Sequence, residues 1–320
     1  MRLTKRNHYN PCFWTALWNK DYHKRMMKNL AHPMPARNHV VHSLNVKSGK
    51  IHKSKVEEIH YDKNLGIAEI SREDAECFVK KYHSGNFVEF LIANKASEYP
   101  VFLDFEQILT EIEKLPPYDV LIKVAKKKLI ETVEEKSYLG CFIVIQQIRS
   151  HAIMNALIQF YEGIGEKKFE HFITLKWMLS NVGFLFKLVH PLVTCRWTLF
   201  SVADDLFPLC DSPILVNPRS LMIALSPELL LEIDRTIPAR EDECLLKRRI
   251  RRRKLDEFRR RTIGNTFREI IGNEKILRKW KTSPEFIKRV SLMSNTKQYN
   301  KMVHKEGNKE IWHINAYSSY

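Results

Sequence analysis

The chain has 320 residues, 44% of them hydrophobic, which is enough to bury the core of one large domain or two smaller ones. No window approaches the run of apolar residues that a membrane span needs, and the basic segment Met1 to Arg6 is not followed by the apolar stretch of a secretory signal. The six cysteines lie far apart without a Cys-x-x-Cys pair, which argues against a cysteine zinc site and favours reduced thiols. We therefore expect a cytoplasmic protein with no membrane partner.

The net charge of +16 is unevenly distributed along the chain. Residues 1–55 hold 12 Lys and Arg against one acid, and residues 247–261 hold ten against two. Residues 56–246 are net acidic. Basic ends around an acidic middle favour a polyanion as partner, and we expect nucleic acid. The alternative is a solvated basic surface without a dedicated ligand.

The first third of the chain begins with residues 1–30, in which aromatic side chains alternate with charges. Residues 40–46 predict a strand closed by a turn at Ser48-Gly49, with residues 51–59 as its hairpin partner. Ser71 is expected to cap a helix, and apolar residues at helical spacing predict another over residues 102–115.

The middle and the end of the chain differ in pattern. Further helices are predicted over residues 118–161 and 167–187. After Pro191 the sequence predicts strands at 193–201, 214–216 and 221–225 and a helical turn at 228–233. It predicts helix again over 242–293, followed by a loose polar tail.

The predicted fold class is α+β, with a helical middle packed on a small, mostly antiparallel sheet assembled from both ends of the chain. We expect one α+β domain over residues 1–275. Residues 276–320 are expected to form a C-terminal helix and a loose basic tail.

Asp211 is the first candidate site residue. Pro213 has no amide donor and biases Ser212 toward extended backbone, which places the Asp211 carboxylate at a sheet edge. There it could bind a divalent cation, orient a histidine or pair with an arginine. Alternatively it caps a turn through its own backbone.

His8 and Arg149 are the other two candidate catalytic residues. His8 lies before the turn-forming Asn10-Pro11 step, where a histidine can serve as a base, a metal ligand or a phosphate contact, or can satisfy nearby backbone groups. Arg149 lies within an apolar helix, so it must be paired or face a polar cleft. Asp211 is the partner we predict for it, in a structural or a catalytic role.

Several short motifs together resemble a bacterial family, domain of unknown function 4238. In order along residues 5–275 they are His8-Tyr9-Asn10-Pro11, Gln146 to Arg149, Trp197, residues 207–215 and Leu225-Ser226-Pro227. Cys210 and Ser212 depart from the family's Thr-Ser-Asp-Asn-Pro motif and remove hydrogen-bonding groups beside Asp211. The family has no settled activity, so the resemblance sharpens the site without indicating a reaction.

The resemblance implies that His8, Arg149, Trp197 and Asp211 meet in one pocket. Arg149 would clamp an anionic or nucleotide-like group, Trp197 would stack on it, and His8 or Asp211 would move a proton or hold a divalent metal. No cofactor is indicated beyond that metal. The predicted ligand contacts are Tyr9, Gln146, Trp197, Ser212 and Ser226.

A second candidate site is the basic segment after residue 246. On a helix its charges would occupy every side, a pattern typical of helices that project into solvent or lie on phosphates. The alternative is a solvated connector helix paired with the acidic middle of the chain. The predicted nucleic-acid contacts are Arg248, Arg249, Arg251, Arg252, Arg253, Lys254, Arg259 and Arg260.

Two functional hypotheses follow. The first is a nucleic-acid-associated effector, such as a nuclease or nucleotide-processing enzyme, with a His/Arg/Asp pocket. The second is a non-catalytic protein- or nucleic-acid-binding module in which the same residues form a structural network.

Overall fold

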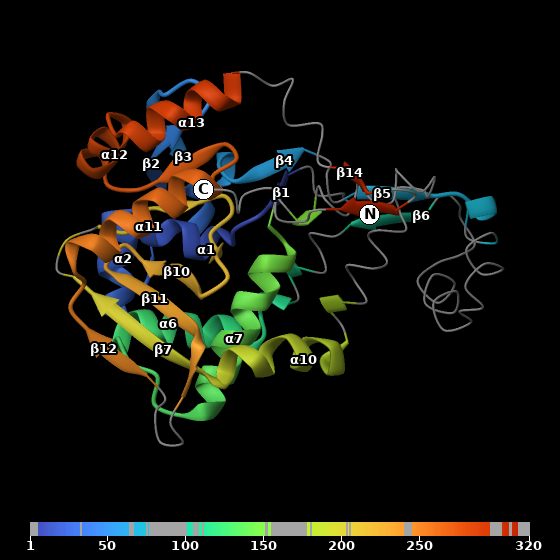
Figure 1. The fold of residues 1–320 in the computed structure, drawn as a ribbon, viewed down its shortest axis with the longest axis horizontal. Helices are drawn as coiled ribbons and strands as arrows, with labels where there is room; N and C mark the ends of the chain where they lie inside the picture. The colour runs from blue at the N-terminus through green and yellow to red at the C-terminus, as the bar shows by residue number, and fades with distance from the viewer. Residues whose placement is uncertain are drawn as a thin grey trace.

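Helices and mostly antiparallel strands share the chain in the computed structural model, which confirms the α+β class (Figure 1). The residues that the structure describes are 6–63, 67–76, 101–104, 109–154, 178–294, 303–306 and 309–312, apart from 33, 75, 111, 151–152, 180, 203, 205 and 240–244.

The larger sheet has the strand order β12-β7-β11-β10-β9, and only the pairing of β12 with β7 is parallel. β10 is buried along its whole length, as is usual for a strand covered on both faces. Its strands are β7 (Cys195–Ser201), β9 (Leu215–Val216), β10 (Ser220–Ser226), β11 (Leu229–Pro238) and β12 (Leu246–Arg248).

The smaller sheet has the order β3-β2-β13-β8 and joins distant parts of the chain. The predicted hairpin is confirmed, since β2 (Val40–Asn45) pairs with β3 (Ile51–Lys55). Gly49 in its turn has a φ of +63°, a conformation that side chains disfavour. β13 (Glu269–Ile271) lies between β2 and β8 (Leu209–Cys210). Two main sheets therefore stand where the sequence predicts one.

The helices cover both sheets. α6 contacts β10 and α10 contacts β7, whereas α11 contacts β8 and β9. Figure 1 shows α6, α7 and α10 gathered beside β7. The bounds are α1 (Cys12–Thr15), η1 (Ala16–Trp18), α2 (Lys20–Met27), η2 (Ala36–Asn38), η3 (Val56–Glu58), α6 (Pro116–Lys127), α7 (Val133–Ile148), α10 (Val182–Val193), α11 (Arg252–Asn265), α12 (Glu274–Lys281) and α13 (Pro284–Ser294).

The remaining strands form two-stranded sheets, and two of them differ from the sequence prediction. Residues 101–104 form a strand, β6, where a helix is predicted, because they pair with β5. The predicted loose tail contains the hairpin β14–β15. The bounds are β1 (Arg6–His8), β4 (Tyr61–Lys63), β5 (Ile67–Ile70), β6 (Val101–Asp104), β14 (Val303–Glu306) and β15 (Lys309–Trp312).

Two helical predictions in the second half are also wrong. The helical turn expected at 228–233 belongs to β11, whose Leu231 lies opposite Ile223 of β10 and Leu199 of β7. The long helix expected over 242–293 is interrupted by β12 and β13. The predicted helix over 167–187 is described only from residue 178 onward, and there α10 extends past Pro191.

The last helices pack on the rest of the fold. The ring of Trp280 in α12 lies 6.1 Å from that of Phe258 in α11. Arg289 of α13 donates to the carbonyl of Thr266 at 2.8 Å. Residues up to Ser294 therefore share one core with the preceding chain. Within the described ranges no helix is long and apolar enough to cross a membrane.

Candidate functional site

Asp211 follows β8 directly and is only 2% exposed. Its carboxylate accepts hydrogen bonds from the backbone N–H groups of Phe267 (2.8 Å), Arg268 (2.5 Å) and Glu269 (3.2 Å). Burial raises the pKa of Asp211 to about 6, although the three backbone N–H groups act in the opposite direction. The carboxylate thus ties the end of β8 to the segment that enters β13.

The residues beside Asp211 are also held through backbone groups. Asn265, at the end of α11, donates to the carbonyls of Ser212 (2.6 Å) and Ile214 (3.3 Å). Ser226 is buried, and its hydroxyl accepts from the N–H of Glu228 at 3.3 Å in the turn between β10 and β11. Ser212 and Ser226 therefore lie in separate backbone turns.

Arg149 is the C-cap residue of α7 and is 1% exposed. Its guanidinium bonds to the Glu113 carboxylate at 2.6 Å and donates to the carbonyl oxygen of His8 at 2.6 Å. The predicted ion pair between Arg149 and Asp211 is wrong, because the Asp211 carboxylate is bound by backbone N–H groups instead. Glu113, in the turn before α6, supplies the carboxylate that neutralises Arg149.

Two further side chains complete the surroundings of Arg149. Gln146 donates to the hydroxyl of Tyr118 at 3.2 Å. Burial raises the pKa of Tyr118 to about 12, so it stays neutral and can act as donor and acceptor. The imidazole Nε2 of His8 lies 3.3 Å from the carbonyl oxygen of Glu57. Arg149 and His8 are therefore joined through a backbone carbonyl of His8.

Trp197 lies within the core of the larger sheet at 0% exposure. Its indole N–H donates to the carbonyl of Leu192 at 2.7 Å, and the Lys136 ammonium lies 5.4 Å from its ring centroid. In this conformation no ring face is open to a ligand. Tyr9 is likewise buried, and its N–H donates to the carbonyl of His60 at 2.7 Å.

Asn10 and His60 join the N-terminal segment to β8 and β13, and no sequence motif points to His60. Asn10 donates to Nδ1 of His60 at 2.8 Å and to the carbonyl of Cys210 at 2.9 Å. The other ring nitrogen of His60 bonds to the carbonyl of Glu269 at 3.1 Å. The neutral ring with its proton on Nε2 fits both contacts. Burial lowers the pKa of His60 to about 3, and its φ of +53° is strained for a residue with a side chain.

These contacts form two groups of hydrogen bonds, which we together call the motif network. The first joins Glu113, Arg149 and His8. The second joins Asn10, His60, Cys210, Glu269 and Asp211, and only the backbone between His8 and Asn10 connects the two groups. The segments around His8, Arg149 and Asp211 do come together, but most of their partners are backbone groups. No group of three or more His, Cys, Asp and Glu side chains in the described ranges could hold a metal ion. A cavity of about 350 Å³ is lined by other residues, between α2 and the β10–β11 turn.

No protein-family model, no curated protein and no solved structure matches the chain. The resemblance to domain of unknown function 4238 therefore stays a prediction.

The basic segment after residue 246 is not one helix. Arg248 ends the edge strand β12, and α11 begins only at Arg252. Seven cations of this segment are exposed and have no acidic partner among the described residues. We call them the basic surface: Lys247, Arg248, Arg249, Arg251, Arg252, Arg253 and Arg260.

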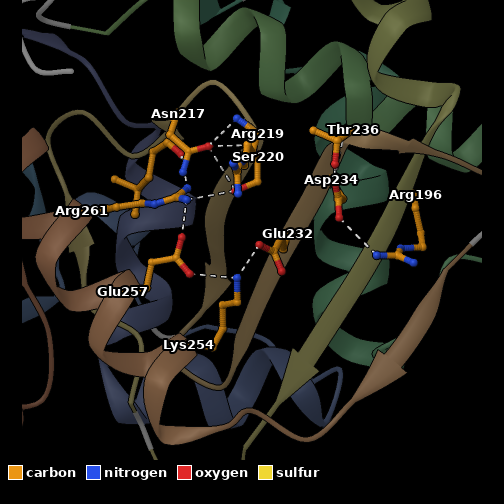
Figure 2. A network of polar contacts seen from close by, with 11 residues as sticks. Arg196, Asn217, Arg219, Ser220, Glu232, Asp234, Thr236, Lys254, Glu257 and Arg261 are labelled. Carbon is orange, nitrogen blue, oxygen red and sulfur yellow. Dashed lines mark hydrogen bonds and ion pairs between the residues drawn. The ribbon is translucent and has the colours of Figure 1, made fainter. Parts of the chain in front are cut away.

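The other cations of the segment are paired. Lys254 lies 2.7 Å from Glu232 of β11 and 2.9 Å from Glu257 of its own helix, as Figure 2 shows. Glu257 also binds Arg261, which donates to the Ser220 hydroxyl at 3.0 Å. Arg259 pairs with Asp256 at 3.4 Å and with Glu285 at 3.3 Å. Lys254 and Arg259, both predicted as nucleic-acid contacts, thus hold α11 on the sheet and on α13.

Glu113→Gln is expected to lower the free energy of unfolding by about 2 kcal/mol, because the buried Arg149 guanidinium loses its carboxylate. Glu274→Gln is the matched control, since Glu274 pairs with Arg278, whose side chain is 70% exposed. The control should change stability by less than about 1 kcal/mol. Urea denaturation measures both, and equal small effects would contradict a stabilising role for Arg149.

Proposed function

We propose that this chain is a non-catalytic nucleic-acid-binding module, and that the motif network stabilises its fold. The Asp211 carboxylate and the Arg149 guanidinium are buried and already bonded to groups of the protein. A residue that clamps a ligand or moves a proton needs access to that ligand. The geometry therefore favours the binding module over the enzyme among the two hypotheses.

The observation that carries the proposal is the basic surface. Seven cations within 14 residues have no acidic partner in the described part of the chain, and they offer the closely spaced positive charge that a phosphate backbone neutralises. Paired cations such as Lys254 and Arg259 show that acidic partners exist on neighbouring elements. Among the described residues, the cations of the basic surface therefore lack acidic partners, whereas Lys254 and Arg259 of the same segment have them.

The start of α11 gives an independent argument. Arg251 stands at the N-cap position without a side-chain cap, and the first turn has no acidic residue. Arg252 and Arg253 place two positive charges at the positive end of the helix dipole, which lowers the stability of the helix. An anion bound there would satisfy backbone N–H groups and arginines together. A phosphate backbone is the anion that this arrangement fits best.

The test replaces Arg251, Arg252 and Arg253 by glutamine in one variant. Its affinity for DNA and RNA should fall at least about tenfold, and the plot of log affinity against log salt should become less steep by about 2 to 3. Fluorescence anisotropy with labelled oligonucleotides at several salt concentrations measures both quantities.

The matched control replaces three exposed lysines of α12, namely Lys275, Lys279 and Lys281, by glutamine. It removes the same charge from a different helix and should leave the slope nearly unchanged. Equal losses in the two variants would show that only net charge matters and would refute a localised surface. Cleavage of DNA or RNA that disappears in His8→Ala at unchanged melting temperature would instead support the enzyme hypothesis.

A further inference from the structure

The cavity between α2 and the β10–β11 turn combines apolar walls with a basic rim. Its volume of about 350 Å³ lies within the range of small-molecule sites. Exposed Lys20 and Lys24 of α2 form part of its rim. The other lining residues are Leu17, Trp18, His23, Met27, Pro227 and Glu228.

The rim carries a net positive charge. Among the lining residues that the structure describes, Glu228 is the only acid, and it binds Lys128 with an Nζ–Oε2 distance of 2.8 Å. Lys20 and Lys24 have no acidic partner in the described part of the chain. An occupant with an apolar body and negative groups close by would match both the walls and the rim.

Phe207 connects this cavity with the helix that carries the basic surface. Its carbonyl accepts from the Trp18 indole at 2.8 Å, and its N–H donates to the Pro227 carbonyl at 3.1 Å. Its ring lies 5.5 Å from that of Phe258 in α11, edge to face. The lining residues Trp18 and Pro227 are therefore fixed by a residue that packs on α11.

Strand register places the cavity and the basic surface at the same end of the larger sheet. Arg248 of β12 lies opposite Phe200 of β7, and Leu229, which follows the β10–β11 turn, lies opposite the next residue, Ser201. Beyond Arg248 the chain continues through Arg249 and Arg251 into the first turn of α11. Figure 1 shows α2 and β12 on the same side of the molecule.

Resting on the proposed function, we infer that this cavity receives a base of a single-stranded nucleic acid whose phosphates lie on Lys20, Lys24 and the basic surface. Proteins that bind single strands combine a positive groove with apolar or aromatic contacts to the bases. In a duplex the bases are stacked and paired, so that none can enter a cavity without being flipped out. The inference therefore predicts a preference for single strands.

The experiment compares three probes of equal length: a ten-nucleotide oligo-dT, its abasic counterpart with the same phosphates, and a ten-base-pair duplex. The wild-type protein should bind oligo-dT about tenfold more tightly than the abasic strand. Met27→Trp fills the cavity, so it should reduce the affinity for oligo-dT to that for the abasic strand. Its affinity for the duplex should change by less than about twofold.

Ile287→Trp on α13 is the matched control, since Ile287 is exposed and does not line the cavity. Circular dichroism melting shows whether Met27→Trp is folded. Should it not fold, Lys20→Gln with Lys24→Gln decides the question, and it should weaken oligo-dT binding more than Lys275→Gln with Lys279→Gln does.

The outcomes separate the inference from the proposed function. Equal binding of oligo-dT and the abasic strand, with both lost in the variant of Arg251, Arg252 and Arg253, would overturn the cavity inference and leave the proposed function standing. Unchanged oligo-dT binding by folded Met27→Trp would also overturn the inference. Absence of salt-dependent binding to all three probes by the wild-type protein would overturn both.

Discussion

Asp211→Ala is expected to lower the free energy of unfolding by about 3 to 5 kcal/mol. The substitution leaves the backbone N–H groups of Phe267, Arg268 and Glu269 without their acceptor. Each unsatisfied buried donor costs about 1 to 3 kcal/mol. The loss also releases the end of β8 from the segment that enters β13, so the effect should be among the largest for a single substitution. Urea denaturation followed by circular dichroism measures it.

Two further variants make this test specific. Asp256→Ala removes a carboxylate that is 42% exposed and pairs with Arg259 at 3.4 Å, so it should cost less than about 1 kcal/mol. Asp211→Asn keeps one acceptor oxygen but turns an amide toward a backbone N–H, so its cost should lie between those of the two alanine variants. An Asp211→Ala protein as stable as the wild type would refute the structural role of this carboxylate.

The parts of the fold that the sequence predicts well are determined locally. The hairpin of residues 40–55 combines an apolar strand with a turn in which Gly49 adopts a φ of +63°, and both signals lie within a few residues of each other. The reciprocal hydrogen bonds of Ser71 and Asp74 confirm the expected helix start. By contrast, residues 229–233 are predicted as a helical turn, but they lie between β10 and β7, and pairing with two neighbours outweighs the local preference.

The site was less predictable, because it depends on which distant groups meet. The sequence shows that Arg149 needs a partner, but nothing in its spacing selects Glu113, which lies 36 residues earlier, over Asp211. His60 carries no local motif and acquires its role only from contacts with Asn10 and Glu269. The alternation of aromatic and basic residues around Trp18 was the one signal for the cavity at α2.

His60→Ala is expected to cost about 3 to 4 kcal/mol at pH 8, where the wild-type ring is neutral in both the folded and the unfolded state. The variant loses the hydrogen bonds to Asn10 and to the Glu269 carbonyl and leaves a cavity where the ring was. His52→Ala in β3 is the control, because His52 is 41% exposed and contacts the Glu269 side chain at 3.3 Å. The control should cost less than about 1 kcal/mol.

The pH dependence distinguishes this role of His60 from a packing effect alone. The pKa of His60 is about 3 in the folded protein and 6.5 in the unfolded chain. Between pH 3 and pH 6.5 the unfolded chain therefore binds a proton on this ring that the folded protein does not bind. Its contribution to stability is complete above pH 6.5 and decreases as the pH falls, by about 1.4 kcal/mol per pH unit. Asp211 acts in the opposite sense, because its folded pKa of about 6 exceeds the unfolded 3.8 and the folded protein binds the proton between them.

The two contributions largely cancel in the wild-type protein between about pH 4 and pH 6, and single substitutions should separate them. The stability difference between wild type and His60→Ala should grow as the pH rises from 4 to 6.5 and stay constant above pH 7. With Asp211→Asn, stability should instead rise more steeply with pH than in the wild type over the same interval. Urea denaturation at half-unit steps of pH measures both slopes. Stability differences that do not vary with pH would mean that folding does not shift the pKa of His60 or of Asp211. That result would contradict the burial and the hydrogen bonds of both residues.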